Sequence, residues 1–115
     1  MTKEKLREKL DTLDSKSSLK EMQQYIGEMI QVRGFADETL KDLMILLTEE
    51  TGELAKEVRK LSNMKTDITN KTTGNIEGEL ADILIYLLSI SVHLNIDLFE
   101  SFKAKELKNT QRTWK

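Results

Sequence analysis

The chain has 115 residues, of which 33% are charged and 5% aromatic, and it contains neither cysteine nor proline. This length and composition predict one all-α domain spanning residues 1–115, and the lack of cysteine excludes a disulfide framework or a thiolate metal site. The formal net charge of −2 gives no general attraction to nucleic acid or to an anionic membrane, so neither is expected as a partner.

The first expected helix lies in an N-terminal extension, residues 1–16. Apolar side chains recur there at helical spacing among many charges, at Leu6, Leu10 and Leu13. With so few apolar residues, the segment is predicted to be a marginal helix that either packs on the domain or stays mobile. The start of the chain lacks the apolar stretch of a secretory signal, and residues 83–96 are too few to cross a bilayer. A cytoplasmic location is therefore expected.

Two helices with apolar stripes are expected next. Ser18, three residues before a glutamate, forms a capping box, and the stripe that follows it continues until Gly34 ends the helix. Either Asp37 or Thr39 can cap the second of these helices. Its stripe consists of Leu43, Leu46, Leu47, Glu50, Leu54, Val58 and Leu61. Glu50 therefore occupies a position where a leucine is expected.

The second half of the chain predicts a loop and two further helices. Residues 62–75 are polar and are expected to form a flexible loop that can act as a lid. Asn75 can cap a helix from Ile76 to about Leu94, which is apolar on nearly all sides and is expected to be buried in a bundle or at a subunit interface. Asp97 caps a last helix from Leu98 to about Lys108. The expected fold is an oligomeric four-helix bundle with the additional N-terminal segment.

Two pairs of acidic residues interrupt the apolar helices. Side chains three residues apart lie on the same helix face, so Glu50 pairs with Glu53, and Glu79 pairs with Asp82. Most glutamates are solvated surface charges, but a carboxylate in an apolar stripe costs roughly several kcal/mol unless it is paired or protonated. A cation that prefers oxygen ligands, such as Mg²⁺ or Mn²⁺, removes that penalty. The four carboxylates are therefore predicted to form a metal site.

Other titratable residues nearby are assigned different positions. Glu49 lies one turn before Glu53 and is equally consistent with a role at the site, as a water-orienting base or a residue just outside the metal ligands, and with a solvated surface position. Glu57 is predicted to lie at the surface, paired in solvent with Lys60. His93 lies roughly 16 Å along its helix from the acidic pair, so it is excluded as a ligand of the same metal. The acidic motifs also lack the Glu-x-x-His pattern of ferritin-like di-iron proteins.

The order and spacing of the motifs resemble the all-α nucleoside triphosphate pyrophosphohydrolases of the MazG-like superfamily, especially the members similar to dCTP pyrophosphatase. The family motif E-E-x-x-E occurs here at residues 49–53, and E-x-x-D occurs at residues 79–82. The second motif continues as Asp-x-Leu-Ile-Tyr-Leu over residues 82–87, and a K-x-x-x-N-x-x-R pattern follows at residues 105–112. The resemblance extends over residues 33–114.

This resemblance implies a set of functional residues. Mg²⁺, with Mn²⁺ as a substitute, is expected to bind Glu50, Glu53, Glu79 and Asp82, and catalysis is assigned to Glu49 and Glu50. Substrate contacts are implied for Phe35, which would face the base, and for Tyr86, Lys105, Asn109 and Arg112. Trp114 either shields the base or anchors the tail on the bundle. The plainer interpretations of these residues are a core position for the aromatic side chains and solvation for the charged ones.

The predicted function is Mg²⁺-dependent hydrolysis of a (deoxy)nucleoside triphosphate to the monophosphate and pyrophosphate, as nucleotide-pool housekeeping. Metal ions bridge phosphate oxygens and neutralise developing charge, which is what this reaction requires. The expected partners are the nucleotide and a second copy of the chain, in a homodimer or homotetramer. The alternative is a non-catalytic helical assembly or nucleotide-binding protein that retains the acidic metal cage.

Overall fold

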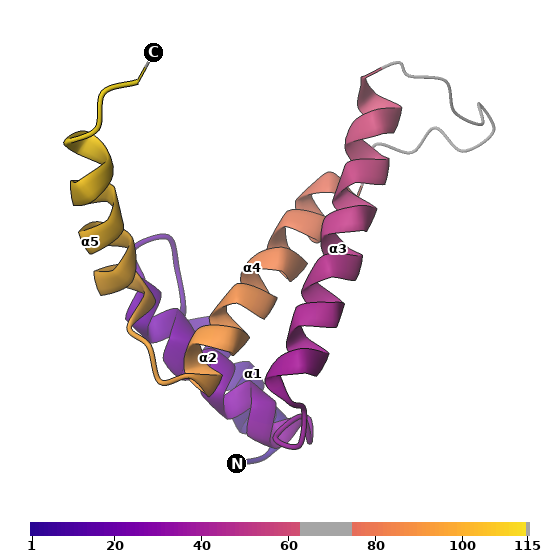
Figure 1. The fold of residues 1–115 in the computed structure, drawn as a ribbon. Helices are drawn as coiled ribbons and strands as arrows, with labels where there is room; N and C mark the ends of the chain where they lie inside the picture. Colours follow the sequence, from indigo (N-terminus) through magenta and orange to yellow (C-terminus); the bar gives the residue numbers. More distant parts are fainter. Residues whose placement is uncertain (63–74, 115) are drawn as a thin grey trace. The chain divides into compact units, whose positions relative to one another are not determined.

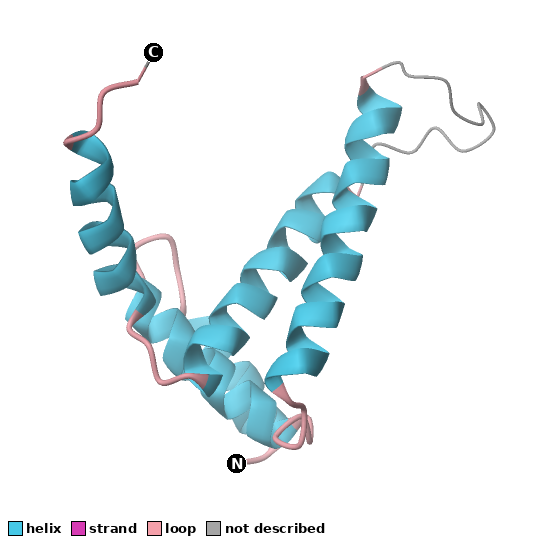
Figure 2. Ribbon diagram, in the orientation of Figure 1, coloured by secondary structure: helices cyan, strands magenta, loops and turns pink. Residues whose placement is uncertain are grey.

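The computed structural model describes residues 1–62 and 75–114, and over those residues it contains helices and loops but no strand (Figures 1 and 2). The helices are α1 (Lys3–Thr12), α2 (Leu19–Val32), α3 (Leu40–Leu61), α4 (Ile76–His93) and α5 (Leu98–Thr110). The all-α prediction is confirmed, with each expected helix in place. Most of the loop predicted at residues 62–75 lies outside the described residues.

The chain forms two compact units, and the boundary between them falls within α4. The first unit comprises Met1–Asp37 and Leu88–Lys115, and therefore contains α1, α2, the end of α4 and α5. The second unit, Glu38–Leu87, contains α3 and the first three turns of α4. In the described part of the chain, no single helix has the length and apolar composition needed to cross a membrane, although α4 and α5 taken as a bent pair meet that test.

The starts of three helices follow from side-chain caps that the sequence predicts. At α2, the Ser18 hydroxyl accepts a hydrogen bond from the Glu21 N–H at 3.0 Å, and the Glu21 carboxylate accepts one from the Ser18 N–H at 3.2 Å. Thr39, rather than Asp37, caps α3, and the aspartate three residues later completes a second capping box. Asp97 caps α5. Each cap satisfies backbone N–H groups that the first turn of a helix leaves without partners.

The ends of α2 and α4 share one backbone motif, in which a residue with positive φ follows the helix. Gly34 has a φ of 74° after α2, and Asn95 has a φ of 54° after α4. In both, the next residue donates its N–H to the carbonyl five positions earlier, at 2.9 Å after α2 and 2.8 Å after α4. This is the Schellman arrangement, which Gly favours and Asn tolerates. The predicted stop at Gly34 is confirmed.

The N-terminal extension packs on α2, so the first of its two predicted states holds. Leu6 of α1 is buried, as are Tyr25, Ile26 and Met29 of α2. Lys9 Nζ also lies 2.7 Å from a carboxylate oxygen of Glu28. Burial of one leucine and a half-exposed ion pair anchor α1 to α2.

The apolar surface of α4 is only partly covered within one chain. The buried residues of α4 lie towards its end, at Leu88, Ser89 and Ser91. In the second unit, Leu80, Leu84 and Leu87 remain between 38% and 53% exposed. Their i, i+4, i+7 spacing places them on one face of the helix. Burial of α4 at the centre of a single-chain bundle is therefore not observed for these residues.

Candidate metal centre

Three of the four predicted metal ligands converge in the second unit. Glu50 comes from the middle of α3, whereas Glu79 and Asp82 come from the first two turns of α4. One carboxylate oxygen from each residue lies within 4.8 Å of the other two. Glu50 and Glu79 are partly buried and Asp82 is exposed, so the cluster opens to solvent on one side. We call Glu50, Glu79 and Asp82 the acidic cluster.

The position of the cluster follows from helix geometry. Glu79 and Asp82 are three residues apart, so both project from one face of α4. They lie near the N-terminus of that helix, where the macrodipole favours negative charge. Glu50 occupies the leucine-like position in the α3 stripe that the sequence identified, and it meets the two acids of α4.

The surroundings of Glu79 favour its protonated form. The pKa of Glu79 rises from 4.5 to about 7, chiefly because its side chain shares a hydrogen bond with Glu50. Desolvation and the charges of Glu50, Asp82 and Glu53 raise that pKa further. The second oxygen, Glu79 Oε2, is buried and has no hydrogen-bond partner among the described residues. An orphaned carboxylate oxygen on a residue that clusters with two other acids is suited to a cation.

The two remaining acids of the first motif are exposed on α3. Glu53 lies outside the group of oxygens within 4.8 Å of one another, although its charge contributes to the raised pKa of Glu79. Glu49 is exposed, and its charge acts on Tyr86. Both are therefore close enough to influence the site electrostatically without belonging to the acidic cluster.

Tyr86 lies one turn beyond Asp82 on α4 and is half-buried. Its pKa is raised above 10.0, first by desolvation and then by the charge of Glu50, followed by those of Glu38, Asp82 and Glu49. The phenol consequently stays protonated near neutral pH and is available as a hydrogen-bond donor. Glu38, which the sequence reasoning missed, precedes the N-cap of α3. The only feature of the sequence that could have identified Glu38 is its position beside that cap.

The prediction that Glu57 lies at the surface is wrong. The residue is only 6% exposed, and its Oε1 lies 3.5 Å from Lys60 Nζ, so the predicted pairing is present but is buried. Glu57 follows Glu50 by seven residues, which returns it to the same face of α3. The predicted stripe instead followed Val58 and Leu61, which are exposed. The charge of Glu57 was therefore a poorer guide to its burial than its spacing of seven residues from Glu50.

A family model for the MazG nucleotide pyrophosphohydrolase domain matches residues 38–114, more than half of the chain. This chain belongs to that family. The matched region begins just before α3 and includes the acidic cluster, Tyr86 and α5, whereas α1 and α2 precede it. A search of the curated proteins found no match, and a search of the solved structures found none.

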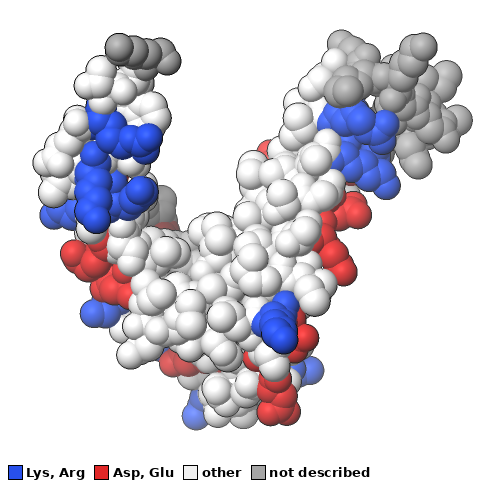
Figure 3. Space-filling model, in the orientation of Figure 1, with Lys and Arg blue, Asp and Glu red and all other residues white. Residues whose placement is uncertain are grey.

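The remaining predicted site residues of the MazG domain belong to the first unit. Lys105 and Asn109 lie on α5 and Arg112 follows it, and Lys and Arg side chains gather over this helix (Figure 3). Asn109 donates a hydrogen bond to Glu106 at 3.3 Å.

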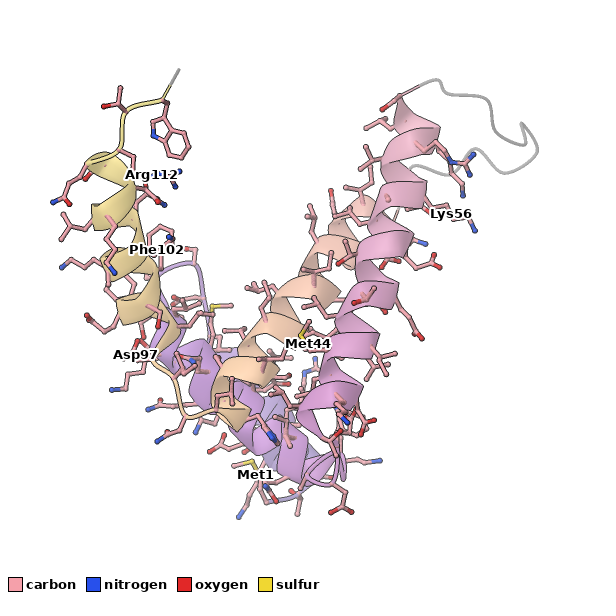
Figure 4. All side chains as sticks on the ribbon, in the orientation of Figure 1. Met1, Met44, Lys56, Asp97, Phe102 and Arg112 are labelled. Carbon is pink, nitrogen blue, oxygen red and sulfur yellow. The ribbon has the colours of Figure 1, made fainter. Side chains whose placement is uncertain are left out.

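The two predicted aromatic contacts also lie in the first unit, and both are exposed. The Arg112 guanidinium lies 4.2 Å from the centre of the Trp114 ring, a cation–π contact at the end of the chain shown in Figure 4. Trp114 remains 69% exposed, so it stacks on Arg112 rather than anchoring the tail in a core. Phe35 is exposed after the α2 stop at Gly34.

Proposed function

We propose that this MazG-domain protein hydrolyses a (deoxy)nucleoside triphosphate to the monophosphate and pyrophosphate, with a divalent cation held by the acidic cluster. Family membership supports nucleotide pyrophosphohydrolysis as the reaction class. The observation that carries the proposal is the convergence of Glu50, Glu79 and Asp82 oxygens within 4.8 Å. A role in clearing unwanted nucleotides from the cellular pool is the corresponding physiological proposal.

The donor set of the cluster fits a hard cation. All three groups offer carboxylate oxygens, the ligands that Mg²⁺ and Mn²⁺ prefer, and Glu79 Oε2 is buried with no hydrogen-bond partner in the described part of the chain. The raised pKa of Glu79 reflects first its hydrogen bond with Glu50 and then burial and the repulsion from neighbouring carboxylates, which a cation would relieve. We assign Glu53, one turn along α3 from Glu50, as the fourth carboxylate of the site. When bound, the cation supplies charge neutralisation on phosphate oxygens and a lower pKa for the attacking water.

In the reaction, a water oxygen forms a bond to the α-phosphorus. The bond between the α-phosphorus and the oxygen that bridges the α- and β-phosphates breaks. Glu50 and Glu49 are the proposed acceptors of the water proton, since both are carboxylates on the α3 side of the site. Tyr86 is proposed to donate a hydrogen bond from its neutral phenol to a phosphate oxygen. Pyrophosphate leaves with the bridging oxygen, so the products are the monophosphate and pyrophosphate.

The proposed phosphate contacts outside the acidic cluster come from α5 and the residues after it. Lys105, Asn109 and Arg112 recur at intervals of four and three residues, which places their backbone positions along one side of α5 and its end. Lysine and arginine there would contact the phosphates through charge-assisted hydrogen bonds. Phe35 and Trp114 are the proposed aromatic contacts of the base. These roles follow from the family resemblance.

Self-association is proposed through the uncovered face of α4. Leu80, Leu84 and Leu87 form an exposed apolar stripe, and a second copy of the chain would bury it. The proposed assembly is a homodimer or a homotetramer.

The decisive experiment incubates purified protein and Mg²⁺ with a panel of nucleoside triphosphates and identifies the products. Pyrophosphate and monophosphate should appear in equal amounts, and EDTA should stop the reaction. Release of orthophosphate as the first product would contradict the assignment. Nucleotide binding without turnover of any member of the panel would favour a non-catalytic module that retains the metal cage.

A further inference from the structure

Gln23 of α2 joins three segments of the first unit through a buried side chain. The residue is 8% exposed. Its Nε2 donates to the Ser91 hydroxyl at 2.7 Å and to the Ile96 carbonyl at 2.8 Å. Its Oε1 accepts from the Leu98 backbone N–H at 3.3 Å. One amide thus contacts the end of α4, the α4–α5 turn and the first residue of α5.

The chemistry of the partners determines how this amide must be oriented. A backbone carbonyl only accepts, so the Ile96 oxygen requires the NH₂ group of Gln23. A backbone N–H only donates, so Leu98 requires the amide oxygen. Glutamine offers two N–H donors and a carbonyl acceptor together, as these partners require. A glutamate would place an acceptor against the Ile96 carbonyl and bury a charge.

The contacts of Gln23 fall where the backbone changes direction between two helices. Asn95, with its φ of 54°, ends α4, and Ile96 closes the Schellman motif by donating to Ser91. Leu98 then supplies one of the N–H groups that the first turn of α5 leaves without a partner in the helix. Gln23 satisfies that N–H from another helix, while Asp97 caps the Glu100 N–H.

Beyond its first turn, α5 buries no side chain against the described residues. No residue of α5 is buried, and Phe102 in the middle of the helix (Figure 4) is 63% exposed. Within the first unit, α5 packs against α2, the helix that carries Gln23. The orientation of α5 therefore depends on its first turn more than on a buried face.

We propose that Gln23 is a positioning residue for substrate binding, acting through α5. The proposal rests on the proposed function, because Lys105, Asn109 and Arg112 of that helix and its end are the assigned phosphate contacts. Gln23 lies before residues 38–114, the region matched by the family model. The N-terminal part of the chain thereby contributes to the site by holding the helix that binds the phosphates.

The test compares Gln23→Met, which keeps length and flexibility but removes all three hydrogen bonds, with Gln24→Met. Gln24 is the exposed neighbour of Gln23 on α2, and both residues line one surface groove of about 380 Å³. Backbone hydrogen exchange in the first turn of α5 should accelerate by at least ~10-fold in Gln23→Met and stay unchanged in Gln24→Met. This readout requires no enzymatic activity.

The kinetic readout separates positioning from general damage. In Gln23→Met, KM for the triphosphate should rise by at least ~10-fold while kcat changes by less than ~3-fold, because the catalytic carboxylates belong to α3 and α4. Affinity for Mn²⁺, measured without nucleotide, should stay at the wild-type value. Ser91→Ala removes only one partner and should shift exchange and KM in the same direction by a smaller factor, which tests the idea even if Gln23→Met fails to fold.

The outcomes distinguish the two proposals. Unchanged α5 exchange in Gln23→Met, or in Ser91→Ala if the former does not fold, would overturn the role of Gln23. A fall in kcat with KM unchanged would overturn it as well. If the wild-type protein turns over no triphosphate but α5 exchange accelerates as expected, the proposed function fails while the anchoring of α5 by Gln23 stands.

Discussion

Metal binding by this protein should become about tenfold tighter between about pH 6 and about pH 8, because Glu79 must lose a proton before its carboxylate can bind a cation. The pKa of Glu79 is about 7 in the metal-free fold. A group with that pKa is about 90% protonated one pH unit below it and about 10% protonated one unit above it. The competing proton therefore lowers apparent affinity about 11-fold at the lower pH and only about 1.1-fold at the higher one.

Isothermal titration calorimetry with Mg²⁺ or Mn²⁺ measures both the affinity and the proton release. Repeating each titration in two buffers of different ionisation enthalpy gives the number of protons released per metal ion. We expect about 0.9 proton at about pH 6 and about 0.1 at about pH 8. Glu79→Gln should abolish this pH dependence together with much of the affinity. Glu77→Gln, an exposed neighbour in the first turn of α4, should retain the wild-type values.

Stability of the metal-free protein should change with pH in the opposite direction to metal affinity. Below the ordinary pKa of 4.5, both the folded and the unfolded chain hold the Glu79 proton. Between 4.5 and about 7 only the folded chain holds it, so raising the pH through this window removes stability, and the effect levels off above about 7. For the metal-affinity prediction, an affinity that is flat between about pH 6 and about pH 8, with no proton release, would refute the competition between a proton and the metal at Glu79.

Further predictions concern the catalytic acids, the assembly and the end of the chain. Glu50→Gln or Asp82→Asn should lower turnover by at least ~100-fold while leaving the metal-free melting temperature equal or higher, since each removes a charge from a repulsive cluster; a large loss of stability with activity retained would identify these acids as structural. Light scattering at about micromolar concentration should show at least a dimer of the 13.3 kDa chain, and Leu84→Lys should yield the monomer; a monomeric wild type would contradict the interface on α4. Trp114 is the single tryptophan and lies over Arg112, so its emission should change when a triphosphate binds in the presence of Ca²⁺ and should cease to respond in Arg112→Gln. Unaltered emission despite binding detected by calorimetry would remove Arg112 from the phosphate contacts.

The helices could be predicted from the sequence because their limits depend on nearby residues. A capping box needs a hydroxyl and a carboxylate three residues apart, as at Ser18, and a helix stop needs a residue that tolerates positive φ, as at Gly34. Both are read within one turn of the chain. The same locality explains why α5 was predicted to start at Asp97, where the cap lies, but to end two residues early, since its last turn carries no such signal.

Burial of polar side chains was not predictable in this way. Glu57 carries the charge of a surface residue, yet it lies in the buried face of α3 beside Lys60. Gln23 is also polar, and its partners Ser91, Ile96 and Leu98 lie 68 to 75 residues further along the chain. No local pattern records which distant groups will satisfy a buried amide or carboxylate, so such residues are missed when each is judged by its own polarity.

The candidate site also combines features that follow from local sequence with features that depend on tertiary packing. Helical spacing alone determined that Glu79 and Asp82 share one face of α4, because three residues make nearly one turn. Only the packing of α3 against α4 decided that Glu50, rather than Glu53, completes the group of oxygens within 4.8 Å. The raised pKa of Glu79 likewise arises from the approach of Glu50 across the two helices, since the hydrogen bond and the repulsion between the two carboxyl groups depend on distance in space rather than separation in sequence.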